Sequence, residues 1–405
     1  MKSGKKISTV LLLENIHKQA ESVLKELNVT IKRLNKSPTE VELINSLKNV
    51  NILCSRSRTQ ISQEVFLKSN LDCIGLFCIG VNQVDLESAC QQGVPVFNAP
   101  YGNTRSVAEI VIGFLSVLAR SICDRNQNMH RGIWEKSDRG SFELRGKTLG
   151  IIGYGNIGSQ VSVLAESFGM KVLYYDIISK LPIGNAKPCF HLKNLLKNTH
   201  FVTVHVPQTP QTKNLIGEKE ISYMQKGSYL INTSRGSVLD ILAVKKALKS
   251  GHLAGAALDV FPKEPKSNQE KFNSPLQNIK SLVLTPHVSG ITEESLLSIA
   301  FEVCKSLKDF LKTGTIQNSV NFPKLLTPSI SPLVTRVSNI HKNQPGVLSQ
   351  INRLVSQSGV NIKSQYLATN EHIGYLIMDL EKKNVQKLAE KMSQLEVSIK
   401  TRIIS

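Results

Sequence analysis

Short apolar runs alternate with amphipathic stretches from the start of the chain. Four of these runs have the length and composition of buried strands, and the stretches between them repeat apolar residues at helical spacing. The predicted strands are Val10–Leu13, Val50–Cys54, Ile74–Cys78 and Val94–Asn98, and the predicted helices between them are Glu40–Leu47 and Asp85–Gln92. Strands that alternate with helices predict a parallel sheet with crossover connections.

A longer helix is predicted next, beginning near Ser106. Ser106 and Glu109 have the S-x-x-E spacing of a capping box, and apolar residues keep helical spacing as far as Leu118. A second α/β unit is predicted over residues 146–288, and another helix over Ile291–Thr313.

The last part of the chain has a pattern of its own. The stretch Asn318–Pro332 holds three prolines and few charges, which is typical of a linker. After it the predicted elements are the strand Val334–Ile340, the helix Pro345–Ser358, the strands Val360–Leu367 and Ile373–Leu380, the helix Val385–Leu395 and the strand Val397–Ile404. This βαββαβ order is that of a ferredoxin-like domain.

A glycine-rich turn, GYGNIG, follows the predicted strand Leu149–Ile152, and a helix and another strand come after it. Gly153 permits the tight turn, Gly155 lets the backbone approach a pyrophosphate, and Gly158 lets the helix pack close to the strand. Asp176 ends the next strand, 18 positions after Gly158 (176 − 158). Its carboxylate would accept hydrogen bonds from a ribose and repel a 2′-phosphate, which favours NAD over NADP. The alternative is a glycine-rich turn that binds nothing.

Three polar residues follow strands or strand-like runs in the second α/β unit. They are Arg235, Glu264 and His287. Ligands of open α/β sheets bind outside the carboxyl ends of the strands. An arginine can hold a carboxylate through two parallel hydrogen bonds, a histidine can take a hydroxyl proton, and a glutamate beside that histidine orients it. This trio suits the oxidation of a 2-hydroxy acid, although each residue alone could be an ordinary turn, loop or cap residue.

The charge balance admits several kinds of partner. The 50 Lys and Arg exceed the 31 Asp and Glu, so the formal net charge is +19 (50 − 31). Nucleic acid, an anionic surface or small anionic substrates would all suit this charge. No run of five Lys/Arg and no aromatic-basic interleaving is present, so nucleic acid ranks last.

Cysteine use and hydropathy indicate a cytoplasmic protein. The seven cysteines form no C-x-x-C pair, so no zinc ribbon or other metal site is predicted, and the scatter suits a reducing compartment. The longest helix-like apolar stretch, Ile110–Ala119, is well short of the roughly 20 residues that span a bilayer. We therefore expect neither a signal peptide nor a membrane span.

Long motifs resemble those of the D-2-hydroxyacid dehydrogenases, and within them the bacterial D-3-phosphoglycerate dehydrogenases. The matching stretches are Arg56–Thr59, Cys78–Asp85, Asn98–Glu109, Trp134–Lys136, Leu149–Gly158, His205–Pro207, Met224–Asp240, Ala254–Pro265 and Leu284–His287. The resemblance extends over nearly the whole chain. It implies a Rossmann-type NAD domain (104–289) inserted in a flavodoxin-like substrate domain (1–103 and 290–331), with a C-terminal ferredoxin-like ACT domain (332–405).

The resemblance also implies roles for individual residues. Arg235 would bind and polarise the substrate, and His287 would be the acid/base, paired with Glu264. The residues implied to hold NAD are Gly153, Gly155, Asn156, Ile157, Gly158, Asp176, His205, Pro207, Thr233, Ser234, Asp259, Ser289 and Gly290. The residues implied to grip the carboxylate and phosphate of 3-phosphoglycerate are Arg56, Ser57, Arg58, Asn103 and Lys136. The alternatives are a solvated basic turn for Arg56 and Arg58 and a plain surface lysine for Lys136.

The tail resembles an ACT regulatory domain. In serine-inhibited members of the family, His341, Asn343 and Asn361 would bind L-serine between two subunits, whereas a plain dimerisation module would bind nothing. The glycine pair that often precedes this tail is missing from Pro332–Thr335, so the coupling of the tail to catalysis is left open. Trp134, the single tryptophan, matches a residue that packs on a neighbouring subunit, but could also be core. A homotetramer is expected.

These features together predict a cytoplasmic, NAD-dependent enzyme that oxidises 3-phospho-D-glycerate in the first step of serine biosynthesis, with 2-oxoglutarate as a further substrate. Two other functions remain open. One is a dehydrogenase for an unphosphorylated hydroxy acid, and the other is an NAD-sensing corepressor-like protein.

Overall fold

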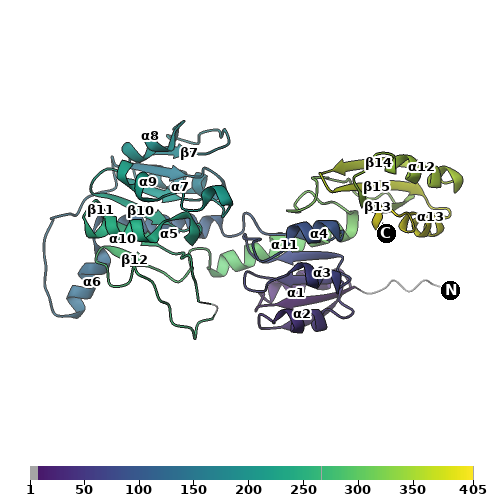
Figure 1. The fold of residues 1–405 in the computed structure, drawn as a ribbon, viewed down its shortest axis with the longest axis horizontal. Coiled ribbons are helices and arrows are strands. Elements are labelled where there is room, and N and C mark those ends of the chain that lie inside the picture. Colours follow the sequence, from purple (N-terminus) through teal and green to yellow (C-terminus); the bar gives the residue numbers. More distant parts are fainter. Residues whose placement is uncertain (1–7, 266, 405) are drawn as a thin grey trace. The chain divides into compact units, whose positions relative to one another are not determined.

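The computed structural model describes residues 8–265 and 267–404, in two compact units (Figure 1). The first unit takes the described residues up to Gly102 together with those from Leu296 onward, and the second is Asn103–Ser295. The chain therefore leaves the first unit once and re-enters it once.

The first unit contains a parallel sheet of five strands in the order β2-β1-β3-β4-β5. Its elements are β1 (Thr9–Leu13), α1 (Gln19–Lys25), β2 (Thr30–Leu34), α2 (Glu40–Ser46), β3 (Ile52–Ser55), α3 (Gln63–Leu67), β4 (Cys73–Leu76), α4 (Leu86–Gln91) and β5 (Val96–Phe97). The expected alternation of strands and helices is confirmed.

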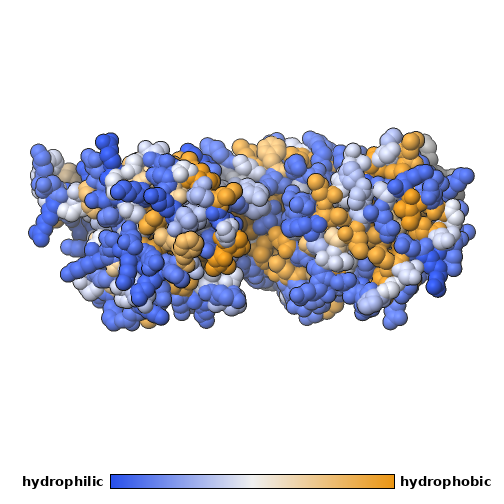
Figure 2. Space-filling model, turned by 90° about the horizontal axis from the view of Figure 1, so that it is seen from above, coloured by the Kyte–Doolittle hydropathy of each residue, from blue (hydrophilic) through white to orange (hydrophobic). Residues whose placement is uncertain are grey.

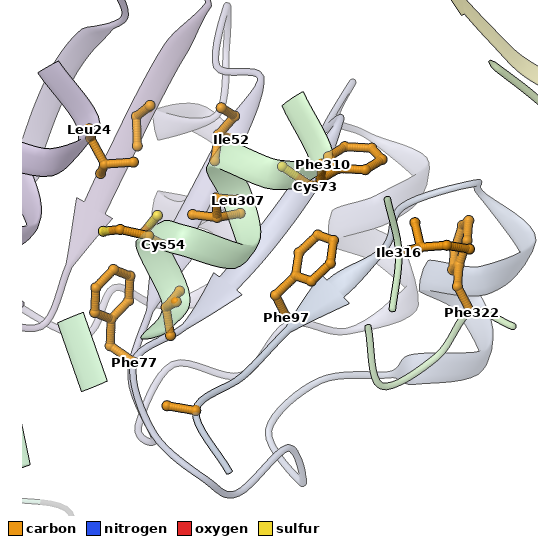
Figure 3. Close-up of a cluster of buried hydrophobic side chains, with 14 of the residues drawn as sticks. Leu24, Ile52, Cys54, Cys73, Phe77, Phe97, Leu307, Phe310, Ile316 and Phe322 are labelled. Atoms are coloured by element: carbon orange, nitrogen blue, oxygen red, sulfur yellow. The ribbon is translucent and has the colours of Figure 1, made fainter. Parts of the chain in front are cut away.

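Helix α11 (Glu293–Thr313) returns the chain to this sheet. Its Leu307 and Phe310 are buried among side chains of the strands, and the rings of Phe97 and Phe310 lie with centroids 5.6 Å apart (Figure 3). Gly75 in β4 is a glycine because a Cβ there would lie 2.8 Å from Val303 of α11. The return of the chain therefore completes the core of the first unit.

The second unit is built on a parallel sheet of seven strands, in the order β12-β11-β10-β9-β6-β7-β8. Its elements are α5 (Thr104–Ala119), α6 (Ile122–His130), β6 (Thr148–Ile152), α7 (Asn156–Ser167), β7 (Lys171–Tyr175), β8 (Lys187–Pro188), α8 (Leu192–Lys197), β9 (Phe201–Val204), α9 (Glu218–Tyr223), β10 (Ser228–Asn232), α10 (Ile241–Lys249), β11 (Leu253–Leu258) and β12 (Leu282–Leu284). The strand order reverses beside β6, so the glycine-rich turn lies where ligands bind in such sheets.

The tail forms an antiparallel sheet in the order β14-β15-β13-β16, with two helices. Its elements are β13 (Val334–Lys342), α12 (Val347–Gln357), β14 (Ile362–Thr369), β15 (Ile373–Glu381), α13 (Val385–Ser393) and β16 (Ser398–Ile404). The predicted βαββαβ fold is confirmed. Pro345 lies outside the first helical turn, because α12 begins after Gly346, whose φ is +84°.

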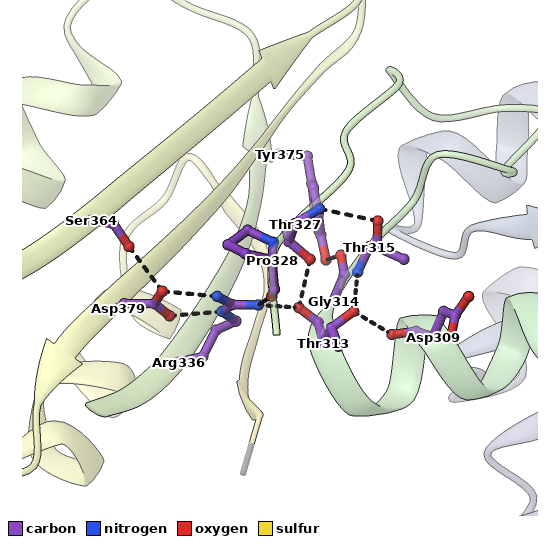
Figure 4. Close-up of polar contacts among 10 residues, drawn as sticks. All are labelled: Asp309, Thr313, Gly314, Thr315, Thr327, Pro328, Arg336, Ser364, Tyr375 and Asp379. Carbon is purple, nitrogen blue, oxygen red and sulfur yellow. Dashed lines mark hydrogen bonds and ion pairs between the residues drawn. The ribbon is translucent and has the colours of Figure 1, made fainter. Parts of the chain in front are cut away.

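A buried arginine of the tail is held by an ion pair within the tail and contacts the segment that precedes it. Arg336 of β13 is fully buried and binds both carboxylate oxygens of Asp379, at 2.7 and 2.8 Å (Figure 4). Its remaining nitrogen donates to the carbonyl oxygens of Thr313 and Pro328. The predicted linker is thus anchored at Pro328 to the domain that follows it.

The predicted capping box at Ser106 is wrong. Helix α5 begins two residues earlier, with Asn103 as its N-cap and no side-chain hydrogen bond at the cap. The Ser106 hydroxyl is bonded to the Thr292 hydroxyl, and Glu109 pairs with Arg105. The partner of Ser106 is therefore 186 residues away, whereas the partner of Glu109 lies one helical turn before it.

The surface carries both polar and apolar residues. The face shown in Figure 2 is mostly hydrophilic, with hydrophobic patches between. Over the described residues no single helix is long and apolar enough to cross a membrane. Only α5 and α6 taken together pass on length and composition, and they are bent by 64°.

Candidate active site

The turn between β6 and α7 is shaped by glycines. A Cβ on Gly153, whose φ is +91°, would overlap the carbonyl of His205, and a Cβ on Gly158 would overlap the carbonyl of Gly153. At Gly155, by contrast, a Cβ would meet none of the described atoms within 4 Å. Two glycines are therefore required by packing, and the third faces open space at the start of α7, where free N–H groups favour an anion.

Asp176 follows β7 and organises the same turn. Its Oδ2 accepts a hydrogen bond from the N–H of Tyr154 at 2.8 Å, and its Oδ1 accepts one from the N–H of Ile178 at 3.0 Å. An ionised carboxylate has about four acceptor positions, so capacity remains for the hydroxyls of a ribose. The geometry agrees with the predicted discrimination in favour of NAD.

Several buried polar atoms of the second unit lack partners within the described parts of the chain. Among them are Oγ1 of Thr233, Nδ1 of His205 and Oδ1 of Asn103. His205 is only partly buried as a residue, but this nitrogen is closed off from solvent and Nε2 lies 2.9 Å from the hydroxyl of Thr203. Burial lowers the pKa of His205 to about 3, so the ring is neutral. Together with the open space at Gly155, these orphaned atoms fit a polar ligand of the dinucleotide class.

Arg235 lies in a turn directly after β10. The side chain of Asn232 donates to the carbonyl of Arg235 and accepts from the N–H and hydroxyl of Ser234, which fixes the turn. Gly236 has no room for a side chain, because a Cβ there would overlap the backbone of Phe261. The segment that carries Glu264 therefore packs directly on the turn that carries Arg235.

His287 and Glu264 form a hydrogen-bonded pair. Nδ1 of His287 lies 2.8 Å from Oε2 of Glu264, and the other oxygen of Glu264 accepts from the N–H of Phe261 at 3.0 Å. Partial burial opposes ionisation of Glu264, but the hydrogen bond and charge of His287, the Phe261 N–H and Arg235 together hold its pKa below the ordinary value. The three predicted residues, from separate strand ends, thus lie in one electrostatically coupled group.

Asp259 holds the turn that presents His287. This fully buried carboxylate accepts hydrogen bonds from the hydroxyl of Thr285 and from the N–H groups of Val288 and Ser289. His287 itself has a left-handed backbone, with φ of 55°, and its N–H donates to the carbonyl of Asp259. Asp259 was predicted only as a cofactor contact. Asp259 ends the strand-like run 255–259, and this position is the sequence signal from which its second role could have been predicted.

The residues predicted to bind the carboxylate and phosphate of the substrate are divided between the two units. Arg56, Ser57 and Arg58 follow β3 in the first unit, with Ser57 and Arg58 exposed. Asn103 lies in the second unit with its side chain against Gly290, where a Cβ would overlap it. Lys136 is exposed, and no contact is described between it and Asn103 of the same unit.

Trp134 is 77% exposed in the single chain, so the core alternative is wrong. Lys36, a residue near the first strands, forms an ion pair with Glu42 at 2.6 Å. The adjacent Ser37 is hydrogen-bonded to Thr59, so this segment lies beside the turn after β3.

The tail has a cavity of about 250 Å³ at the start of α12. Its lining includes the predicted effector residues His341 and Asn343 as well as Leu367 and Thr369 of the edge strand β14. The third predicted residue, Asn361, does not line this cavity. It lies instead beside Glu381, toward which its amide points at 3.5 Å.

Comparison with known proteins gives consistent matches. Residues 112–289 match the family described as D-isomer specific 2-hydroxyacid dehydrogenase, NAD binding domain, and residues 337–400 match the AHAS small subunit-like ACT domain. The chain is 47% identical over 396 residues to D-3-phosphoglycerate dehydrogenase of Dictyostelium discoideum, covering 98% of this chain and 97% of the relative. Identity to D-3-phosphoglycerate dehydrogenase of Escherichia coli (strain K12) is 45%, covering 97% of each.

A solved structure supports the same assignment. D-lactate dehydrogenase from Aquifex aeolicus, complexed with NAD and lactic acid, is similar with a TM-score of 0.68 and 28% identity, covering 78% of this chain and all of that one. The predicted Rossmann-type NAD-binding fold and the ACT domain are therefore confirmed, and the chain is an NAD-dependent oxidoreductase. It belongs to the D-3-phosphoglycerate dehydrogenases, a branch of the D-isomer specific 2-hydroxyacid dehydrogenases.

Proposed function

We propose that this chain oxidises 3-phospho-D-glycerate to 3-phosphooxypyruvate with NAD, the first step of L-serine biosynthesis. The observation that carries the proposal is the pair formed by His287 and Glu264 at 2.8 Å, with Arg235 close enough to help lower the pKa of Glu264. Relatives with 42–47% identity over nearly the full length carry the name of this activity.

The chemistry assigned to these residues is proton transfer and charge binding. Because Nδ1 of His287 is occupied by Glu264, Nε2 is the nitrogen that takes the proton of the substrate's 2-hydroxyl. Arg235 binds the carboxylate and polarises the forming carbonyl. Bound NAD supplies the acceptor for the hydride that leaves carbon 2. In the reverse direction His287 returns the proton.

NAD would be held by the glycine turn, by Asp176 and by a row of residues at the strand ends. The pyrophosphate would lie at Gly155, Asn156 and Ile157, and the ribose at Asp176. The remaining residues assigned to the cofactor are Gly153, Gly158, His205, Pro207, Thr233, Ser234, Asp259, Ser289 and Gly290. The hydroxyl of Thr233, which is buried and has no partner among the described residues, supports this assignment.

The substrate, which carries a carboxylate and a phosphate, would be held by Arg56, Ser57, Arg58, Asn103 and Lys136. Two arginines one residue apart can wrap an anion, since each guanidinium offers a fork of donors. An enzyme for an unphosphorylated hydroxy acid would not need this set. Reduction of 2-oxoglutarate, a dianion of similar size, is included in the proposal as a second reaction.

L-Serine would act as an inhibitor at the tail. The cavity beside His341 and Asn343 would take the amino acid, and Asn361 of a second copy would complete the site, since Asn361 of the same chain does not line it. The expected assembly is a homotetramer, in which the exposed Trp134 forms part of a further interface.

The division into functional parts and the location in the cell complete the proposal. Residues 1–103 with 290–331 would bind substrate, 104–289 would bind NAD, and 332–405 would regulate. Seven free cysteines support a cytoplasmic location, where thiols stay reduced.

The decisive experiment is NADH formation from 3-phosphoglycerate, followed at 340 nm and titrated with L-serine. We expect turnover by the wild type, turnover of lactate and glycerate at much lower rates, and a loss of about 10²–10⁴-fold in kcat for His287→Ala. Equal rates with all three substrates would reject the role of the phosphate. Full activity of His287→Ala would reject the mechanism. Binding of NADH without turnover of any of the three substrates by the wild type would favour the corepressor-like alternative, and turnover without any response to serine would reject the regulatory site alone.

A further inference from the structure

Glu14 is a buried carboxylate at the end of β1. Its residue is 8% exposed, and its backbone and that of Asn15 are both left-handed, with φ of 54° and 52°. Strand β1 pairs in parallel with β3, with Leu12 opposite Cys54, so Glu14 stands where the chain leaves β3. Two successive left-handed residues are costly outside glycine, which indicates that surrounding contacts hold this turn in place.

All four hydrogen bonds described for the Glu14 carboxylate come from the segment Ser55–Thr59. Oε1 accepts from the hydroxyl of Ser55 at 2.9 Å, and from the N–H and hydroxyl of Thr59 at 2.8 and 2.6 Å. Oε2 accepts from the N–H of Arg58 at 3.1 Å. One side chain therefore joins the first and last residues of the segment and closes it into a loop.

The opposite side of the loop is held by Gln83. This side chain, in a residue 6% exposed, donates to the carbonyl of Arg56 at 2.8 Å and to that of Gly80 at 3.2 Å. The N–H of Ile61 then donates to the carbonyl of Gln83 at 2.8 Å. The backbone of the loop is thus fixed on both sides, while no contact among the described residues occupies the side chains of Arg56, Ser57 and Arg58.

We propose that Glu14 is a positioning residue for substrate, which holds the loop so that Arg56 and Arg58 converge on an anion. The inference rests on the proposed function, because it assumes that this loop grips 3-phosphoglycerate. The negative charge of Glu14 itself opposes a nearby anion, so its contribution to binding is the order that its four hydrogen bonds give the loop. An ordered loop binds its ligand without a further loss of conformational entropy.

The test is Glu14→Gln. The amide is nearly isosteric, but its NH₂ would face the N–H of Arg58 or the donors of Ser55 and Thr59, so one side of the loop is released. We expect the KM for 3-phosphoglycerate to rise about tenfold, the effect of losing one hydrogen bond to a charged group, while kcat and the KM for NAD stay within about twofold. Calorimetric titration with 3-phosphoglycerate and with inorganic phosphate should give a matching loss of affinity.

Two further variants make the test specific. Leu43→Ala truncates a buried side chain in the same domain and should lower the Tm without changing the KM for 3-phosphoglycerate. Thr59→Val removes a single donor to Glu14 and should raise that KM about threefold. If Glu14→Gln fails to fold, the KM of Thr59→Val for 3-phosphoglycerate is the measurement that tests the inference.

The inference would be overturned if Glu14→Gln folds and its KM for 3-phosphoglycerate is unchanged, or if Thr59→Val, used in its place, leaves that KM unchanged. It would also be overturned if Leu43→Ala raises the KM for 3-phosphoglycerate as much as Glu14→Gln does. Failure of the wild type to turn over 3-phosphoglycerate is a different result, because it rejects the proposed function. In that case equal affinity of wild type and variant for inorganic phosphate overturns the role of Glu14, and weaker binding by the variant supports it.

Discussion

His205 is a histidine whose surroundings keep it neutral. Its Nδ1 is enclosed without a partner among the described residues, and burial lowers its pKa to about 3. An unfolded histidine has a pKa of about 6.5. Between these two values the unfolded chain binds a proton that the folded chain does not, so acid favours unfolding.

We therefore expect the stability of the NAD-binding domain to be fully present above about pH 6.5 and to fall as the pH is lowered toward 3. His205→Gln keeps a group that can bond to Thr203 but cannot titrate, so its unfolding free energy should depend less on pH over this range. Urea unfolding at several pH values measures both slopes. His130→Gln, at an exposed position of α6, is the control, and an identical slope in His205→Gln and wild type would contradict the expectation.

The residues proposed to be catalytic could be grouped from the sequence at this scale, but the residues that hold other parts of the proposed site could not. Arg235, Glu264 and His287 each follow a strand of one parallel sheet, so the rule for strand ends was enough to group them. Glu14 also follows a strand, but its partners lie 41–45 residues further along the chain. No local pattern marks a carboxylate that will accept four hydrogen bonds from so distant a loop.

At the scale of elements, the contact between β6 and α7 depends on Gly158. A Cβ there would overlap the carbonyl of Gly153, inside the turn that is assigned to the pyrophosphate. To make room for a Cβ on Gly158, α7 would have to move away from β6. This movement would displace the N–H groups at the start of the helix.

Gly158→Ala should therefore weaken NADH binding at least tenfold and lower the Tm, since forcing extra atoms into a packed site costs about 1–3 kcal/mol. Fluorescence titration with NADH and a thermal melt are the measurements. Gly113→Ala is the matched control. Gly113 lies within α5 and a Cβ there would meet no described atom within 4 Å, so alanine should raise stability by about 0.5–1 kcal/mol. Unchanged NADH affinity in Gly158→Ala would show that the turn tolerates the side chain.

Most helices and strands were predictable because the hydrophobic pattern of each is local in the sequence. Two kinds of feature were not predictable. The strand β2, with the sequence TIKRL, carries two charges and is partly exposed at the sheet edge, so it lacks the apolar run of the central strands. The false capping box at Ser106 arose because the true partner of that hydroxyl, Thr292, is 186 residues away. Edge position and long-range pairing are properties of the folded chain.

At the scale of the whole molecule, the ACT domain is fastened to the rest of its unit by several contacts. Lys400 of β16 pairs with Asp72 at 2.9 Å, and the hydroxyl of Tyr375 donates to the carbonyl of Gly314 at 2.6 Å. A Cβ on Gly93 would lie 3.0 Å from Ile399, so the two surfaces are in close contact. These contacts tie the ACT domain to its unit in a chain that lacks the glycine pair at Pro332–Thr335.

Arg336 adds to this attachment through the carbonyls of Thr313 and Pro328, and its guanidinium is held in place by Asp379 of the same domain. Burial opposes ionisation of Asp379, but hydrogen bonds from Arg336 and Ser364 hold its pKa below the ordinary value. Arg336→Met would leave that carboxylate with little compensation, and removing one partner of a buried pair costs about 3–5 kcal/mol. Because Arg336 also binds Thr313 and Pro328, part of that loss should appear as release of the ACT domain from the unit.

Calorimetry should show a lower Tm for Arg336→Met, and hydrogen exchange should show faster exchange in residues 313–328. The double variant Arg336→Met/Asp379→Leu should recover most of the loss of stability, because it removes both charges and fills the space. It should not recover slow exchange in residues 313–328, whose carbonyls would still lack their donor. Lys363→Met breaks the exposed pair with Glu381 and should cost less than about 1 kcal/mol. A cost for Arg336→Met no larger than that control would mean that the buried pair does not hold the domain.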